Sequence, residues 1–405
     1  MKKSSKLLLI ILLIASLALL VAACGGKSAP AAPAEKEAPA QPAATEAPKE
    51  APAQPAATEA PKDEGPKPMK AAWVYVGPVG DGGWTYAHDQ GRLYVEKNVP
   101  NIETTYIESV PEGADAERVI RDLAQKGYNV IFTTSFGYMD PTETVAAEFP
   151  DTVFIHISGY KKNDTNFDNL FGRMYQMKYL AGVTAAMKSE TGKIGYVAPF
   201  PIPEVIRHIN MATLGARSVN PNAEIQVVWI NTWFDPPTER EAAETLLNAG
   251  NDVIITGADT PGPVQAASEK GKWGMAYDSA NACDNAGDGC LGVPHWNWGP
   301  AYAEIIEEVR AGTFKPVGRW PGADSGIVDF KFGPAATDEI KAKVDEIKQS
   351  IIAGKFNPAA GPINAQSGCL AVKEGEALDD GQLLGMKWFV EGVKGEIPEA
   401  QPPCQ

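Results

Sequence analysis

The sequence predicts an α/β protein in which two open Rossmann-like lobes face each other across a central ligand cleft. From residue 70 onward, short apolar runs of strand type alternate with amphipathic helical stretches. The runs form two batches of four, and the turn-rich residues Glu190, Thr191 and Gly192 separate the batches. Because apolar strands that alternate with helices are typical of a parallel sheet covered on both faces, each batch predicts one lobe.

The predicted elements follow one another in a regular order. Strands are expected at residues 72–76, 104–107, 130–133, 153–157, 194–197, 225–230, 253–256 and 274–277. Helices are expected at residues 84–97, 114–126, 141–148, 175–188, 203–218, 237–249 and 262–270. The strand runs are apolar, β-branched or aromatic, and the helical stretches are amphipathic. Asp235, followed by Pro236 and Pro237, is typical of a helix start.

The two lobes are expected to share the later part of the chain. The first lobe spans residues 70–188 and is joined by about 296–325, and the second spans 189–295 and is joined by about 326–405. The segment from Pro294 to Gly299 is the expected crossing back to the first lobe. Open α/β sheets bind ligands beyond the carboxyl ends of their strands, so the ligand is expected between the lobes.

The first 23 residues have the layout of a lipoprotein signal peptide. Lysines at positions 2, 3 and 6 form a basic start, and an apolar run follows to residue 21. The run is too short for a comfortable membrane span, and two alanines then precede Cys24 as in a bacterial lipobox. We therefore expect a lipid on Cys24 that holds the mature protein outside the cytoplasmic membrane. The alternative is ordinary cleavage near Ala23, with Cys24 incidental.

Residues 24–69 are interpreted as the lipidated cysteine followed by a disordered tether. Residues 37–49 read EAPAQPAATEAPK, and residues 50–62 repeat them letter for letter. This composition offers too little apolar surface to offset the entropy of ordering, and the frequent proline favours extended polyproline II conformations. We expect a semi-stiff spacer between the lipid and the folded body, and the alternative is a repeat that binds a partner.

The four remaining cysteines are Cys283, Cys290, Cys369 and Cys404. An even number in an exported chain predicts two disulfides, for which three pairings are possible. The short spacing favours a Cys283–Cys290 staple, which leaves Cys369 and Cys404 to tie down the C-terminus. Since the chain has no CxxC motif, these cysteines are interpreted as structural.

Charge and motifs exclude several classes of function. The formal net charge of −15 argues against a nucleic-acid partner, because an acidic surface repels phosphates. The four histidines lie far apart in the sequence, so no metal site is expected, and His208, in the middle of a predicted helix, is expected at the surface. The chain has no dinucleotide or P-loop fingerprint, no GxSxG elbow and no HExxH motif. We therefore expect no cofactor and no catalysis.

Aromatic and small polar residues recur just after the predicted strands. The candidate ligand-binding residues are Asp81, Trp84, Thr85, Phe136, Phe200, Trp233, Phe234, Asp259, Asp278, Asn297 and Trp298. One aromatic residue at a strand end usually belongs to the core, but repetition favours a flat polar ligand that stacks on rings. Because three of these residues are aspartates and these loops hold no lysine or arginine, a highly anionic ligand is disfavoured.

These motifs resemble the BMP (basic membrane protein) family of ABC-transporter substrate-binding lipoproteins. The loop Gly80 to Thr85 is similar to the family's Asp-x-x-Phe-Asn ligand loop, with Trp84 in place of Phe and Thr85 in place of Asn. The stretches 135–139, 200–205, 231–236 and 296–300 are similar to one subgroup of the family, and the resemblance covers about residues 70–400.

The resemblance implies a type I periplasmic-binding-protein fold and a purine ligand that is passed to a membrane permease and its ATPase. It also implies that aromatic residues sandwich the base and that acidic residues hold the ribose, with Asp81 and Asp278 at matching positions. The family's lysine near the last crossing is replaced by Asn297 and Trp298. A free base therefore fits as well as a nucleoside.

The residues and the resemblance lead to the same hypothesis. The chain is expected to be a monomeric, lipid-anchored protein that captures a purine base or nucleoside and delivers it to the permease and ATPase of an ABC transporter. The alternatives are a receptor for a sugar or another small polar metabolite, an extracytoplasmic α/β enzyme, and a surface interaction protein displayed on the spacer.

Overall fold

The first lobe is built on a five-stranded parallel sheet. The computed structural model describes residues 65–404, so the predicted signal peptide, Cys24 and nearly all of the tether lie outside the described residues. The strands are β1 (Met69–Tyr75), β2 (Ile102–Ile107), β3 (Val130–Thr134), β4 (Val153–Ile157) and β5 (Phe167–Leu170), in the order β2-β1-β3-β4-β5. The lobe also contains the helices α1 (Trp84–Asn98), α2 (Ala114–Gln125) and α3 (Met139–Glu148) and the short helix η1 (Phe136–Tyr138).

A seven-stranded sheet forms the second lobe, in the order β11-β10-β9-β8-β6-β7-β14. Its strands are β6 (Lys193–Ala198), β7 (Glu224–Trp229), β8 (Val253–Thr256), β9 (Trp273–Met275), β10 (Cys290–Trp296), β11 (Val328–Phe332) and β14 (Val393–Lys394). Only β11 runs antiparallel to its neighbour within this sheet. Its helices are α4 (Tyr175–Lys188), α5 (Pro203–Val219), α6 (Pro236–Asn248), α7 (Gly262–Glu269), α9 (Asp338–Ile352) and α10 (Asp380–Leu384). The short elements η2 (Ala282–Asn285), η3 (Ala323–Ser325), β12 (Ile363–Asn364) and β13 (Leu370–Val372) complete the described chain.

The predicted fold class is confirmed, because the chain forms two α/β lobes on parallel sheets. All eight predicted strands are present within a few residues of their expected bounds. Strands β5, β10, β11 and β14 of the two main sheets were not predicted. Neither were the short strands β12 and β13 or the helices α8 (Trp298–Ala311), α9 and α10. β5 carries Asp168 and Asn169, β10 carries Pro294, and β14 is two residues long, so none of them shows a clean apolar strand pattern.

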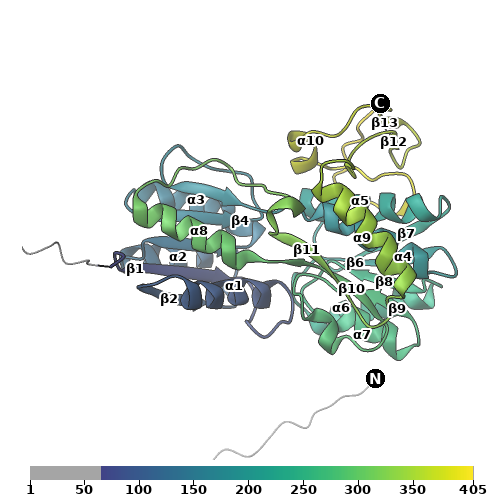
Figure 1. Cartoon of the computed structure of the whole chain (residues 1–405), viewed down its shortest axis with the longest axis horizontal. Helices are drawn as coiled ribbons and strands as arrows, with labels where there is room; N and C mark the ends of the chain where they lie inside the picture. Colours follow the sequence, from purple (N-terminus) through teal and green to yellow (C-terminus); the bar gives the residue numbers. More distant parts are fainter. Residues whose placement is uncertain (1–64, 405) are drawn as a thin grey trace, which may run out of the picture. The chain divides into compact units, whose positions relative to one another are not determined.

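The chain passes between the lobes at three places. After β5 it crosses at residues 171–174, it returns between β10 and α8 (Trp298–Ala311), and it crosses again before β11. Helix α8 packs on α1, so it belongs to the first lobe, and Figure 1 shows it in green beside the blue and purple elements. The first and third crossings are paired through their backbones, since Phe171 N–H donates to Arg319 C=O and Arg173 N–H donates to Pro321 C=O, both at 2.8 Å.

The sequence-based boundary at residue 188 is corrected by helix α4. This helix packs against α5, α9 and β10 of the second lobe, so the first crossing falls before residue 175. Most of α4 is buried, because it is sandwiched between other elements instead of covering the outside of the first lobe. The turn-rich residues 189–192 therefore join two elements of one lobe.

The two disulfides pair as the spacing favoured, Cys283 with Cys290 and Cys369 with Cys404. The first staples η2 to the start of β10, and the second ties the chain end to the loop before β13. Within residues 65–404, no helix combines the length and the apolarity needed to cross a bilayer.

Helices α4 and α5 approach each other closely at two glycines. A side chain added at Gly182 would overlap the carbonyl group of Ala212, and one added at Gly215 would overlap the carbonyl group of Tyr179. Both glycines lie inside helices, where alanine is otherwise favoured by roughly 0.5–1 kcal/mol. The close approach therefore explains why glycine is required here.

We expect Gly215→Ala to lower the free energy of unfolding by about 1–3 kcal/mol, the usual effect of overpacking a core. Chemical denaturation measures this change. Gly80→Ala is the control, because no atom lies within 4 Å of a side chain added at that loop position. A stability gain in Gly215→Ala would contradict the close contact between the helices.

Candidate functional site

A pocket lies between the two lobes, beyond the carboxyl ends of their strands. The first lobe contributes Val76, Trp84, Ser135, Phe136 and Ser158. The second lobe contributes Tyr196, Glu204, Val205, His208, Trp233, Gly257, Asp259, Tyr277 and Asp278. The position follows the general rule for open α/β sheets, whose ligands bind beyond the carboxyl ends of the strands.

The lobes touch each other on both sides of this cavity. The loop before α1 meets the loop after β8, where Gly83 lies so close to the carbonyl group of Asp259 that a side chain would overlap it. Ser158 follows β4 of the first lobe directly, and its hydroxyl group donates a hydrogen bond to the Glu204 carboxylate of α5 at 2.8 Å. These contacts describe a closed arrangement in which both lobes line one site.

Aromatic side chains from both lobes reach the cavity. Phe136 follows β3 in the first lobe and Trp233 follows β7 in the second, and both are half-buried. The ring of Phe200 supports Trp233 at a centroid distance of 5.0 Å. Trp84 is held by its indole N–H, which donates to the carbonyl oxygen of Thr134 at 2.7 Å. The cavity therefore offers flat apolar surfaces whose orientation is already fixed.

Four polar atoms of the cavity wall are buried without a hydrogen-bond partner among the described residues. They are the hydroxyl groups of Tyr196 and Tyr277, the Nε2 atom of His208 and the Oδ2 atom of Asp259. Buried polar groups are nearly always paired in folded proteins, so each exception calls for an explanation. All four belong to the second lobe, and a ligand with polar edges would satisfy them.

Three carboxyl groups line the second-lobe side of the cavity, and one lysine is buried against Tyr277 of the same wall. Burial raises the pKa of Glu204, Asp259 and Asp278, and repulsion between the acids raises that of Asp259 further. Lys178 of α4 is fully buried, its Nζ atom lying 3.2 Å from the carbonyl oxygen of Thr256 and 3.1 Å from the ring centre of Tyr277. Burial lowers the pKa of Lys178 to about 7, while Asp278 and Glu204 act in the opposite sense.

Five of the eleven candidate residues line the cavity: Trp84, Phe136, Trp233, Asp259 and Asp278. Of the others, Phe200 lies behind Trp233, and Phe234 is outside the lining although it is next in sequence. Asp81 and Thr85 serve the backbone of their own loop. The Asp81 carboxylate accepts hydrogen bonds from the N–H groups of Gly83, Thr85 and Tyr86 at 2.8–2.9 Å, and burial raises its pKa to about 6.

Trp298 and Asn297 point away from the cavity. The Trp298 ring is buried between Trp296 and His88, stacked at 4.6 Å from each. The Asn297 amide donates to the carbonyl oxygen of Gly326 at 3.3 Å and lines a separate hollow with His295. These residues follow β10, but Asn297 is the N-cap residue of helix α8 and Trp298 begins it, so both belong to the packing of the first lobe.

Sequence reasoning missed several residues of the lining. His208 was expected at the surface but is buried and lines the cavity, because α5 is enclosed by α4 and the C-terminal segment. Tyr196 and Tyr277 lie in or beside strands, where aromatic residues usually belong to the core. Lys178 did carry a signal, since it is a single charge within an otherwise apolar stretch of α4.

The buried amine of Lys178 should leave a mark on the pH dependence of stability. Its pKa is about 7 in the folded protein and about 10.4 in an unfolded chain, so between these values the unfolded state binds the additional proton. The free energy of unfolding contributed by this group therefore rises with pH, by at most about 1.4 kcal/mol per unit.

We expect the stability difference between the wild type and Lys178→Met to shift in favour of the wild type from pH 7 to pH 10. Denaturant titrations at half-unit intervals measure this difference. A difference that stays constant over the window would mean that Lys178 titrates as an exposed amine.

Comparisons with known proteins agree with a binding site between lobes. Residues 69–357 match the Bmp family, described as ABC transporter substrate-binding protein PnrA-like. The chain is 42% identical over 334 residues to a purine-binding protein of Brucella abortus, covering 82% of this chain and 94% of that protein. It is 41% identical over 331 residues to a Haloferax volcanii protein with a provisional name as an ABC transporter glucose-binding protein, covering 82% and 81%.

Solved structures show the same fold at lower identity. An ABC transporter solute-binding protein from Aeropyrum pernix aligns with a TM-score of 0.64 at 19% identity, covering 72% of this chain and 93% of that one. A solute-binding protein from Conexibacter woesei aligns with a TM-score of 0.58 at 22% identity, covering 71% and 98%.

Proposed function

The chain belongs to the PnrA-like (Bmp) family of ABC transporter substrate-binding proteins, and we propose that its ligand is a purine base or nucleoside held between the two lobes. We infer from this family that the chain works outside the cytoplasm and that its activity is binding and not catalysis. The permease and ATPase of an ABC transporter are the proposed recipients of the ligand.

One observation carries the purine proposal: flat aromatic surfaces from both lobes meet unpaired polar atoms in one closed cavity. Phe136 and Trp233 offer rings to the faces of a flat ligand, and stacking of a base on such a ring contributes roughly 1–3 kcal/mol. Tyr196, His208 and Asp259 offer hydrogen bonds to its edges. A purine has both features, because its ring is flat and its nitrogen and oxygen atoms lie on the rim.

Charge disfavours a phosphorylated ligand. Glu204, Asp259 and Asp278 line the cavity, and none of its lining residues in the described part of the chain is a lysine or an arginine. A phosphate dianion would meet carboxyl groups at short range, where repulsion is poorly screened. The proposed ligand is therefore uncharged, a free base or a nucleoside and not a nucleotide.

Glucose is the second candidate ligand, because the Haloferax volcanii relative is almost as similar to this chain as the Brucella abortus protein. Carboxyl groups beside aromatic rings also suit a sugar. The ultraviolet spectrum of ligand extracted from the purified protein separates the two, since a purine absorbs strongly near 260 nm and a sugar does not.

Replacing Trp233 should weaken purine binding and leave the fold intact. The half-buried ring faces the cavity, so we expect Trp233→Ala to reduce affinity by about 1–3 kcal/mol, which is the stacking range. Isothermal calorimetry with adenine, guanine and their nucleosides, and with glucose in parallel, measures the effect.

Trp273→Ala is the matched control for this substitution. Trp273 is also half-buried, but it lies at the start of β9, outside the cavity lining. Ligand-stripped wild type that binds glucose and no purine would replace the purine proposal with the sugar. Equal affinity of Trp233→Ala and wild type would remove this ring from the site.

We also propose that Cys24 carries a lipid and that residues 24–69 tether the binding domain to the membrane. The proposal is supported by the short apolar run, the alanines before Cys24 and the repeated proline-rich segment that follows. A single tethered copy is proposed as the working unit.

Cys24→Ser should release the protein from the membrane fraction into the soluble fraction. Cell fractionation, with mass spectrometry of the mature N-terminus, tests this expectation. A wild-type N-terminus without a lipid mass would contradict the anchor, whatever the fraction in which the protein is found.

A further inference from the structure

The C-terminal segment, residues 358–404, lies beyond the residues that match the family. It contains β12, β13, α10 and β14, and the Cys369–Cys404 disulfide closes it into a loop. In Figure 1 it is the yellow part of the chain, and β14 pairs with β7 at the edge of the second sheet. A segment held in this way is part of the second lobe and not a loose end.

This segment forms hydrogen bonds and an ion pair with helix α5 along its length. The Arg207 guanidinium donates to the carbonyl oxygen of Leu383 at 2.6 Å, and the Asn210 amide donates to the carbonyl oxygen of Trp388 at 2.8 Å. At the far end of α5, Arg217 forms an ion pair with Glu391 at 2.8 Å. Arg207 is fully buried, so the carbonyl group of Leu383 satisfies a charge that would otherwise be stranded.

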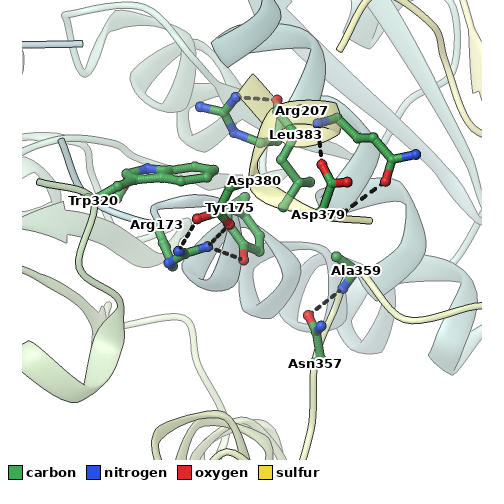
Figure 2. Close-up of polar contacts among 11 residues, drawn as sticks. Arg173, Tyr175, Arg207, Trp320, Asn357, Ala359, Asp379, Asp380 and Leu383 are labelled. Atoms are coloured by element: carbon green, nitrogen blue, oxygen red, sulfur yellow. Dashed lines mark hydrogen bonds and ion pairs between the residues drawn. The ribbon is translucent and has the colours of Figure 1, made fainter. Parts of the chain in front are cut away.

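The same segment also contacts the first crossing between the lobes, through the Arg173–Asp380 pair. Arg173, on the first crossing, makes two parallel hydrogen bonds of 2.7 Å with the Asp380 carboxylate of α10, as Figure 2 shows. The ring of Trp320, on the third crossing, has the guanidinium groups of Arg173 at 4.4 Å and Arg207 at 5.1 Å from its centre. The Trp320 indole N–H donates to the carbonyl oxygen of Gly172 at 3.0 Å, which joins the two crossings.

Helix α5 links these contacts of the C-terminal segment to the ligand cavity. Its first turns supply Glu204, Val205 and His208 to the cavity wall, and Arg207 lies among them in sequence. Glu204 in turn accepts the hydrogen bond from Ser158 of the first lobe. A contact that fixes Arg207 and Arg173 therefore fixes both a wall of the cavity and the hinge on which the lobes close.

We propose that the C-terminal segment is a hinge clamp, in which Asp380, Arg173 and Arg207 are positioning residues that favour the closed lobes and so raise ligand affinity. The claim about ligand affinity rests on the proposed function. The claim about the hinge rests on the described contacts alone. The lobes touch in this structure while the Arg173–Asp380 pair is formed, and we expect the pair to be lost when the crossings turn as the lobes open. A contact made in the closed state alone shifts the population toward it, and apparent affinity follows that population.

The test replaces Asp380 with Asn, which keeps the size of the side chain and removes the charge. Since a partly exposed ion pair contributes modestly, we expect the Kd for the purine bound by the wild type to rise roughly two- to five-fold. Asp380→Glu should restore most of the affinity. In the ligand-free protein, the backbone amides of Arg173 and Arg319, which pair the crossings, should exchange with deuterium faster in Asp380→Asn.

Glu391→Gln is the matched control. The Arg217–Glu391 pair joins the same segment to the same helix, and its arginine is as buried as Arg173, but it lies away from the crossings. This variant should lower thermal stability about as much as Asp380→Asn and leave both the Kd and the hinge exchange unchanged.

The outcomes separate this inference from the proposed function. Equal changes of Kd in the two variants, or unchanged hinge exchange in Asp380→Asn, would overturn the clamp. If the wild type binds no purine, the proposed ligand fails, and hydrogen exchange in the ligand-free protein still decides whether Asp380 holds the hinge.

Discussion

The pairing of two interlobe crossings is the constraint on which the rest of this structure depends. Residues 169–173 and 319–321 exchange backbone hydrogen bonds, so the chain entering the second lobe and the chain returning to it lie side by side. Charge reinforces the pairing, because Arg319 bridges the buried Asp168 of β5 and Glu308 of α8. This pairing brings the carboxyl ends of the two sheets together, and the cavity exists because they meet.

The packing of α4 and α5 explains why charged groups are buried near the cavity. Lys178 and Arg207 are buried on α4 and α5. Helix α4 packs against α5, α9 and β10, and α5 also contacts the C-terminal segment through α10 and β14. Burying such charges is costly unless partners are at hand, and here the partners are carboxyl groups of the cavity wall and backbone carbonyl groups. The binding surface and the interior of the second lobe thus share one electrostatic network, which links ligand capture to the packing of α5.

The two glycine contacts between α4 and α5 serve the same arrangement. Close approach of the helices keeps α5 next to the second sheet, where its first turn can reach the cavity from the side. The C-terminal segment then covers the outer side of α5 and reaches the crossings through α10. One helix therefore receives contacts from the sheet, the hinge and the chain end.

The sequence by itself determined where the strands lie and which residues follow their ends. Apolar, β-branched or aromatic runs were enough to place all eight predicted strands. Most of these strands are buried on both faces and read as continuous apolar runs, whereas β2 and β7 are only partly buried and were placed by their β-branched and aromatic residues. The positions after strand ends led to Trp84, Phe136, Trp233, Asp259 and Asp278, since the carboxyl edge of a parallel sheet is where chain and ligand meet.

Tertiary structure alone decided which buried residues face the cavity. Tyr196 and His208 lie in a strand and in a helix, where the sequence pattern is the same for a core residue and for a cavity wall. Trp298 stands after a strand like the true lining residues, yet the start of α8 turns its ring into an aromatic stack. Periodicity reports burial, but the direction in which a buried side chain points depends on how the elements pack, and that depends on contacts between residues far apart in the chain.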